Sequence, residues 1–431
     1  MLTKWILGNE KNSGRSGALW NTIGGTISAG QSAIILIFIS HKMGIVTAGI
    51  VTIAYAVANL FMTMGKYGMR NFQVTDTGDR YSFGDYVYMR IFSVIAATVI
   101  SCIYLVLCCN FAGYDFTKSV IIFEVIVLKM TDSLEDVYIG RYQQTGRLDI
   151  GAKIMALRLF ISTLAICVVV CMGGNIHAAL LIGIVISVII DVYFIYRITP
   201  VTKTYVGACN LKNVRQLLKM GFPLCVGVTL SIYIGNAPKY MIDWYMDEET
   251  QAIFGYIMMP VFVITLLNQF LYQPVVKTLG DLWNEGQPRE FMKKVGMQYL
   301  IIALLTIVVL VIGYFVGLPV LSVLYNTDLT SYGKEFAVLL FGGGCYALAY
   351  YLNVPITTIR KQGIIAAGYA AAALSTLIFG KYFVVSYGLV GASVLYLIIN
   401  VILVLIYTLA LIINVRKTAK STGGNCNNDT I

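Results

Sequence analysis

Five charged side chains lie on one side of a helix that is otherwise apolar enough to cross a membrane. The helix opens the stretch from Phe116 to Arg158. At about 100° per residue, these side chains fall within about 140° of one another, and they are Glu124, Lys129, Asp132, Glu135 and Asp136. A charged group inside a membrane span is costly unless it is paired or hydrated, and such groups normally mark a pathway or a ligand site. We therefore interpret this face as the lining of a water-filled cavity that admits a polar molecule.

A second interpretation of the same residues stays open. Lys129 lies near the middle of the span, and Asp132 is one helical turn away, within reach of an ion pair. In that case the charges only neutralise one another inside a helix bundle. Buried ion pairs are by themselves weak evidence of a function.

The composition indicates a membrane environment. Of the 431 residues, 58% are hydrophobic and 12% are charged, and the mean hydropathy is +0.78. These values are typical of an all-α polytopic membrane protein. The two histidines and nine scattered cysteines show no zinc-site spacing, and the sequence holds no phosphate-binding GxxxxGKS/T loop. We therefore expect no catalytic residues, no metal, no cofactor and no ATP hydrolysis.

Twelve segments are long enough to cross a bilayer at about 20 residues each. An even number of spans puts both termini on the same side of the membrane. The predicted spans are Gly17–Ser40, Ile45–Met64, Gly84–Cys108, Thr117–Gly140, Gly151–Met172, Ile176–Tyr196, Leu217–Pro238, Gln251–Val276, Lys294–Val316, Lys334–Ile359, Gly363–Val385 and Gly388–Asn414.

The basic residues decide the orientation of these spans. Of the 31 lysines and arginines, 25 fall in the terminal segments and in the loops on the same side as the termini. By the positive-inside rule, this skew places both termini in the cytoplasm. It also accounts for the net charge of +10 without a nucleic-acid partner.

The longest polar interruption, Thr199–Gln216, follows the sixth of the twelve predicted spans. It divides the chain into an N-terminal six-helix lobe, 1–204, and a C-terminal six-helix lobe, 205–414. Two such halves are typical of transporters built from parallel repeats. The polar segment 415–431 is expected to be a disordered cytoplasmic tail.

Helix-breaking residues and neutral amides interrupt several spans. Pro260 and the run Gly342–Gly344 are expected to bend their helices, as breaks do at the hinges or sites of carriers. Amides suit a ligand rich in hydroxyl groups because they both donate and accept hydrogen bonds. The alternative for each amide is a hydrogen bond between helices. The candidates in the C-terminal half are Asn236, Asn268, Gln269 and Gln273.

Five runs of sequence carry a family resemblance. They are YGMRNFQVTD (Tyr67–Asp76), FGDYVYMRI (Phe83–Ile91), GRYQQTGRLDIGAK (Gly140–Lys153), GFPLCVGVTLSIYIGNAPKYMID (Gly221–Asp243) and FGYIMMPVFVITLLNQFLYQPVV (Phe254–Val276). The runs resemble the polysaccharide-transporter family of the multidrug/oligosaccharidyl-lipid/polysaccharide exporter superfamily. Its members are flippases for O-antigen, capsule and teichoic-type repeat units. The resemblance covers nearly the whole chain.

The resemblance implies two six-helix lobes around a central cavity that opens alternately to the two sides of a bacterial inner or plasma membrane. It also implies a substrate in which an oligosaccharide is joined through pyrophosphate to a polyprenyl lipid. Membrane lipids and a polysaccharide polymerase or other assembly proteins are the expected partners.

A pyrophosphate needs cations, and charge-assisted contacts are strong in a low-dielectric cavity. Each arginine at a cytoplasmic mouth has an alternative role as a positive-inside anchor of its loop. The cationic candidates for substrate binding are Arg70, Arg90, Lys129, Arg141, Arg158 and Lys239.

Turnover without ATP hydrolysis needs an ion gradient or the consumption of glycan on the far side. The candidates for carrying H⁺ or Na⁺ are Glu124, Asp132 and Asp191.

Two other functions stay open. A drug/cation antiporter of the same superfamily should have a more apolar, acid-lined cavity. An integral-membrane glycosyltransferase or polymerase needs a sizeable outer loop, and the longest one predicted here, Lys239–Thr250, is short.

We predict that Lys129→Ala lowers the export of lipid-linked oligosaccharide by about tenfold, the size expected for losing one charge-assisted contact. Insertion and abundance of the protein should stay at the wild-type level. Surface polysaccharide and an immunoblot of the membrane fraction measure the two quantities. Loss of the protein itself would instead support the interpretation in which the charges only neutralise one another.

Overall fold

The chain forms helices and no strands in the part that the computed structural model describes, which is residues 2–8, 12–76, 78 and 80–425. The side chains of residues 2, 269, 270, 274 and 418–425 lie outside that description. Two compact units are present, Met1–Ile232 and Tyr233–Ile431, and each is described by itself.

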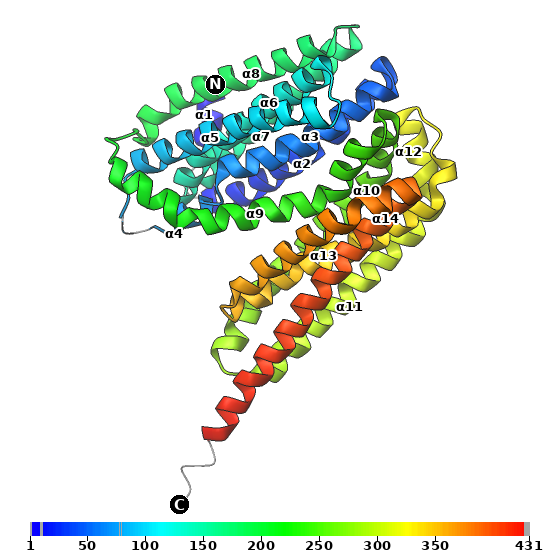
Figure 1. Cartoon of the computed structure of the whole chain (residues 1–431). Helices are drawn as coiled ribbons and strands as arrows, with labels where there is room; N and C mark the ends of the chain where they lie inside the picture. The colour runs from blue at the N-terminus through cyan, green and yellow to red at the C-terminus, as the bar shows by residue number, and fades with distance from the viewer. Residues whose placement is uncertain (1, 9–11, 77, 79, 426–431) are drawn as a thin grey trace, which may run out of the picture. The chain divides into compact units, whose positions relative to one another are not determined.

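The first unit contains eight helices and the first part of a ninth within the described ranges (Figure 1). They are α1 (Leu2–Leu7), α2 (Ser13–Met43), α3 (Ile45–Lys66), α4 (Arg70–Thr75), α5 (Phe83–Phe111), α6 (Phe116–Gln144), α7 (Leu148–Cys171), α8 (Ile176–Thr202) and α9 (Leu211–Tyr245).

The second unit contains the rest of α9 and the remaining helices. They are α10 (Glu248–Asn284), α11 (Pro288–Ile312), a π-helical turn (Gly313–Gly317), α12 (Leu318–Tyr325), a 3₁₀ turn (Thr330–Tyr332), α13 (Gly333–Thr358) and α14 (Gln362–Asn425).

Ten helical segments of the described chain are long and apolar enough to cross a membrane. Two of the twelve predicted spans are not counted separately among them, for different reasons. α6 is long enough, but it carries too many charged residues. The last two predicted spans form the single element α14, whose backbone leaves the helical region at Gly388, with φ 57° and ψ −135°. With α14 divided at this kink, twelve long helices coincide with the predicted spans, and the all-α polytopic class is confirmed.

α6 lies at the centre of the first unit. It packs against α3, α4, α5, α7 and α8, while α2 packs against α3 and α7. Both its apolar residues, such as Val125 and Ile126, and its charged face are buried. A helix that buries most of its circumference must satisfy its buried polar groups inside the protein. The charged face of α6 therefore determines which helices can surround it.

Close backbone approach holds the second unit together. The run Gly342–Gly344 does not break α13, because the helix is continuous from Gly333 to Thr358. A Cβ on Gly342 would lie 2.8 Å from Tyr396 of α14, and one on Gly344 would lie 2.3 Å from Thr306 of α11. These glycines therefore serve close helix packing, and the run does not break the helix; a bend at this run stays a prediction. Pro260 likewise lies within the uninterrupted α10.

Several predicted loops are shorter in the structure. Most of the expected outer loop Lys239–Thr250 is helical, because α9 continues to Tyr245 and α10 begins at Glu248. The polar interruption Thr199–Gln216 shrinks to the residues between Thr202 and Leu211. The boundary between the two units falls inside α9, after Ile232. The predicted division after residue 204 stays a prediction based on span count.

The end of α14 falls in the segment expected to be a disordered tail. Helical backbone extends to Asn425, and residues 426–431 lie outside the described chain. The extent of the tail beyond 414 stays a prediction.

Asp85 joins the start of α5 to the segment that leads into α9. Its carboxylate accepts hydrogen bonds from the backbone N–H of Ser82 (3.0 Å) and of Asn210 (2.8 Å), and from Nδ2 of Asn213 (2.9 Å). The Ser82 hydroxyl accepts a hydrogen bond from the Asp85 N–H, which completes a capping box. The Asp85 side chain is buried, while the residues that donate to it are partly or fully exposed.

We predict that Asp85→Ala lowers the free energy of unfolding by about 3 kcal/mol, because it leaves three donors without their acceptor. Asp115→Ala is the control, since Asp115 caps α6 by accepting a single hydrogen bond from the Lys118 N–H and is exposed. Its expected cost is about 1 kcal/mol. Thermal unfolding of the detergent-solubilised protein, followed by circular dichroism, measures both. Equal costs would contradict the role assigned to Asp85.

Candidate functional site

A buried arginine joins three helices of the first unit. The Arg158 side chain of α7 is 1% exposed and contacts carboxylates on both α6 and α8. Its terminal nitrogen Nη2 lies 2.7 Å from Asp132 Oδ1 and 2.7 Å from Glu135 Oε2, and its Nε lies 3.4 Å from Asp191 Oδ1. Nη1 donates to the Thr131 hydroxyl. Each of the three guanidinium nitrogens thus has a hydrogen-bond partner within the protein.

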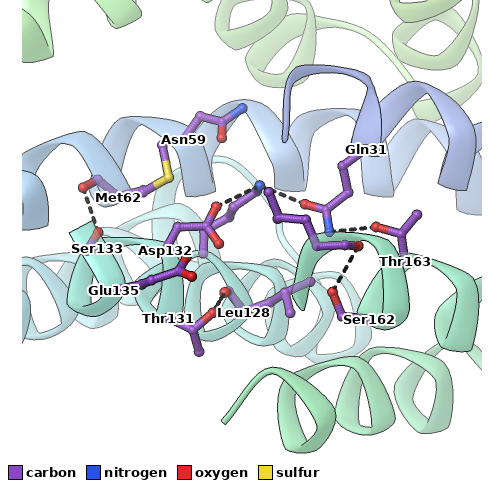
Figure 2. Close-up of polar contacts among 12 residues, drawn as sticks. Gln31, Asn59, Met62, Leu128, Thr131, Asp132, Ser133, Glu135, Ser162 and Thr163 are labelled. Atoms are coloured by element: carbon purple, nitrogen blue, oxygen red, sulfur yellow. Dashed lines mark hydrogen bonds and ion pairs between the residues drawn. The ribbon is translucent and has the colours of Figure 1, made fainter. Parts of the chain in front are cut away.

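Lys129 extends this cluster toward α2. Its ammonium donates to Gln31 Oε1 at 2.7 Å and to Asp132 Oδ2 at 3.0 Å. Gln31 in turn donates to the Thr163 hydroxyl of α7, as Figure 2 shows. Lys129 is 2% exposed. Asp132 is therefore shared between two cations, and α2, α6 and α7 are tied together by one network.

A second arginine pair lies one turn further along α6. The buried Arg90 of α5 donates to Asp136 Oδ2 at 2.8 Å and to the carbonyl of Gly65 at 3.1 Å. Arg70 of α4 lies 3.6 Å from Asp136 Oδ1 and donates to Gln143 Oε1. Its side chain is 28% exposed. Two arginines share one carboxylate here, so this end of the unit carries an excess positive charge.

Two other sequence candidates lie apart from these clusters. Glu124, at the opposite end of α6, lies 2.9 Å from Nδ1 of His177, the second residue of α8. Arg141 donates to Gln144 and stacks over the ring of Phe83. Neither is joined to Arg158 by a contact recorded among the described residues.

The candidates of the second unit lie on α9 and α10. Asn268 is buried and donates to the carbonyl of Ala347 at 2.7 Å, as expected of an amide that joins helices. Gln273 is exposed and Asn236 is half-buried, while the side chain of Gln269 lies outside the described residues. Lys239 is half-buried and forms no ion pair with any described residue.

The structure thus brings together some predicted residues and adds others. Lys129, Asp132, Arg158 and Asp191 form one network, and Arg70 and Arg90 form another. The pairing of these charges within the first unit is what the neutralising interpretation expects, so their roles toward a substrate or an ion stay predictions. Sequence reasoning placed Glu135 and Asp136 on the charged face but gave them no role, although their helical angles already grouped them with Asp132. The carbonyl of Gly65 gave no sequence signal at all.

A cavity of about 160 Å³ lies between α6, α7 and α8. Its walls are mostly apolar and include Leu134, Ile154 and Val192. Glu135 and Asp191 also line it. Two ionisable groups of the Arg158 cluster therefore line a pocket whose other walls include the exposed side chains of Leu134 and Val192.

No protein-family model matches the sequence, and no curated protein matches it either. The fold, by contrast, is shared with membrane transporters of the MOP superfamily.

Three solved structures show this likeness. Lipid II flippase MurJ in an inward closed conformation aligns with a TM-score of 0.70 at 15% identity, over 93% of this chain and 90% of MurJ. A multidrug resistance MATE family transporter in an inward-facing conformation aligns with a TM-score of 0.65 at 12% identity, over 91% and 96%. A eukaryotic MATE transporter aligns with a TM-score of 0.57 at 13% identity, over 94% and 99%. At such identities the likeness establishes the fold.

We predict that Arg158→Ala lowers the free energy of unfolding by about 3–5 kcal/mol, because three buried carboxylates lose their shared partner. Arg70→Ala is the control, with an expected cost below about 1 kcal/mol, since Arg70 is partly exposed and Asp136 keeps Arg90. The midpoint of thermal unfolding and the abundance in membranes measure the difference. A stable Arg158→Ala protein would contradict the structural role of the cluster.

Proposed function

We propose that this chain is a flippase that moves polyprenyl-pyrophosphate-linked oligosaccharide repeat units from the cytoplasmic to the outer leaflet by alternating access. The observation that carries the proposal is the fold, which matches that of lipid II flippase MurJ over 93% of the chain. Lipid II flippases and MATE transporters share this fold, so the choice between a lipid-linked and a soluble substrate rests on the distribution of charge.

The charges of the first unit favour an anionic substrate. Arg70 and Arg90 share the single carboxylate of Asp136, which leaves one positive charge in excess. Arg70 is the partly exposed member of this group, and it lies in one of the runs that resemble polysaccharide transporters. A guanidinium matches the geometry of phosphate oxygens and forms charge-assisted hydrogen bonds with them. We assign Arg70 as the leading candidate for contacting the pyrophosphate.

Lys239 is the corresponding candidate of the second unit. A half-buried ammonium in a membrane helix is costly without a partner, and none of the described residues forms an ion pair with it. An anionic group of the substrate would lower that cost. The exposed amide of Gln273 is available for hydroxyl groups of the glycan, whereas Asn268 already donates to Ala347.

Two alternatives have specific observations against them. A drug/cation antiporter should gather acids without cations, whereas Asp132 is held by Lys129 and Arg158, and Asp136 by Arg90. An integral-membrane glycosyltransferase or polymerase needs a large outer loop, and the loop between α9 and α10 is only Met246 and Asp247. The proposed setting is a bacterial inner or plasma membrane, with both termini in the cytoplasm and the polymerase as a separate partner.

A deletion strain tests the proposal directly. We predict that loss of the gene causes complete lipid-linked repeat units to accumulate on the cytoplasmic side, with surface polysaccharide reduced by at least about tenfold. Mass spectrometry of the lipid-linked glycans, before and after a membrane-impermeant glycosidase is added to intact spheroplasts, measures their amount and side. Repeat units that are already outside, with polymer absent, would indicate a polymerase instead.

Complementation supplies the controls. The wild-type gene should restore export, and Arg70→Ala should not. Arg215→Ala should restore export fully, because Arg215 is exposed near the start of α9.

In inverted vesicles, dissipating the proton and sodium gradients should slow translocation. An unchanged rate would contradict ion coupling through any carboxylate of the chain.

A further inference from the structure

The Arg158 cluster contains more acids than bases. Two buried cations, Lys129 and Arg158, face three carboxylates, those of Asp132, Glu135 and Asp191. Asp132 is held by both cations, since one of its oxygens contacts each of them. Glu135 and Asp191 both contact Nε of Arg158, at 3.1 Å and 3.4 Å, so they share the positive charge of a guanidinium that also holds Asp132. With every group ionised, the cluster would carry one uncompensated negative charge.

These two carboxylates are incompletely satisfied. Glu135 Oε1 is buried and accepts no hydrogen bond from any described group, and Asp191 Oδ1, also buried, has among the described residues only the 3.4 Å ion-pair contact with Arg158 Nε. Glu135 is 7% exposed, and both residues line the cavity between α6, α7 and α8. An unpaired buried charge costs several kcal/mol, and the group normally neutralises instead. A cation in this cavity would remove that cost.

The chemistry of the walls favours a proton over a metal ion. Hard metal cations take about six oxygen ligands. Besides the two carboxylates, the cavity offers the hydroxyls of Thr131, Tyr138 and Tyr142. Thr131 already donates to the carbonyl of Leu128 and accepts from Arg158. The remaining walls are hydrocarbon, so a metal ion would be under-coordinated, whereas a proton needs only one oxygen.

We propose that Glu135 and Asp191 share a single exchangeable proton at the surface of the α6–α7–α8 cavity. The proton brings the buried cluster to charge balance, and its release would leave a negative charge that Arg158 alone cannot neutralise. The use of this proton in driving transport rests on the proposed flippase function, whereas its presence on the carboxylates is independent of that function.

Further charged groups surround the pair, including Asp136, which is next to Glu135 on α6 and is paired with Arg90. Lys129 and Asp132 lie on the same helix as Glu135, Arg158 lies on α7, and Lys66 at the end of α3 is half-buried and acts on Asp132 and Glu135 through its field. Figure 2 shows Glu135 beside Asp132 and Thr131 on α6. Lys66 is partly exposed to solvent, so it offsets the surplus charge less than a buried partner would.

The proton can be observed without measuring transport. The full chain in lipid nanodiscs at neutral pH should show the infrared carbonyl stretch of one protonated carboxylic acid, which shifts in D₂O. Glu135→Gln and Asp191→Asn should each abolish this band, because either change removes the surplus acid and lets the other ionise. Both variants should unfold within about 2 °C of the wild type, since an amide replaces a group that is already neutral.

Asp136→Asn is the matched control. Asp136 is as buried as Glu135 and lies on the same helix, but it has a close ionic partner in Arg90. This variant should keep the band and lower the unfolding midpoint by more than about 6 °C. A wild-type protein without the band, or a band that persists in either variant of the pair, would overturn the proposal. So would a fall in midpoint in both variants as large as that of Asp136→Asn.

A sodium titration at constant pH separates the two possible cations. Saturating Na⁺ should change neither the band nor the unfolding midpoint. Loss of the band together with a higher midpoint would identify a sodium site and overturn the assignment of a proton. None of these readouts depends on translocation, so a failed flippase assay would leave the proton site standing.

Discussion

The first unit depends on the contact between the Arg158 guanidinium and the carboxylates of Asp132, Glu135 and Asp191. A charge inside a membrane protein is costly unless it is paired, and most of the partners in this unit come from another helix. Arg158 meets acids of α6 and α8, while Lys129 brings in α2 through Gln31. The network therefore fixes which helices are neighbours, and it does so at positions where apolar packing alone would accept several arrangements.

The two units differ in their buried ionic contacts, whereas glycines that leave no room for a Cβ occur in both, as at Gly140 and Gly344. In the first, ionic contacts repeat along α6, with Arg158 at one turn and Arg90 at the next. In the second, helices approach closely at glycines, and Gly342 and Gly344 leave no room for a Cβ against α14 and α11. Ionic partners demand one geometry, whereas close packing of small residues tolerates sliding. Among the described residues, the buried ion pairs accordingly lie in the first unit.

The distribution of surplus charge connects structure to the proposed function. Arg70 and Arg90 leave one positive charge in excess at Asp136, and the Arg158 cluster has one negative charge too many. The two surpluses meet at α6, where Glu135 and Asp136 are adjacent residues, although Arg70, Arg90 and Asp191 come from α4, α5 and α8. An anionic headgroup and a proton are the two simplest species that would balance them. A transporter that moves an anionic substrate against a proton gradient needs both kinds of site.

The sequence by itself determined the class, because hydropathy reports burial in lipid directly, and it identified α6 as the charged helix from the angular spacing of Glu124, Asp132 and Glu135. The sequence could not decide whether the charged side chains of that face are hydrated or form ion pairs with other helices. The partners come from distant positions, Gln31, Arg90, Arg158 and Asp191, which no periodicity connects to α6. Only the tertiary structure decided that two bases face three acids, because the balance of charge in a cluster is a property of contacts between helices.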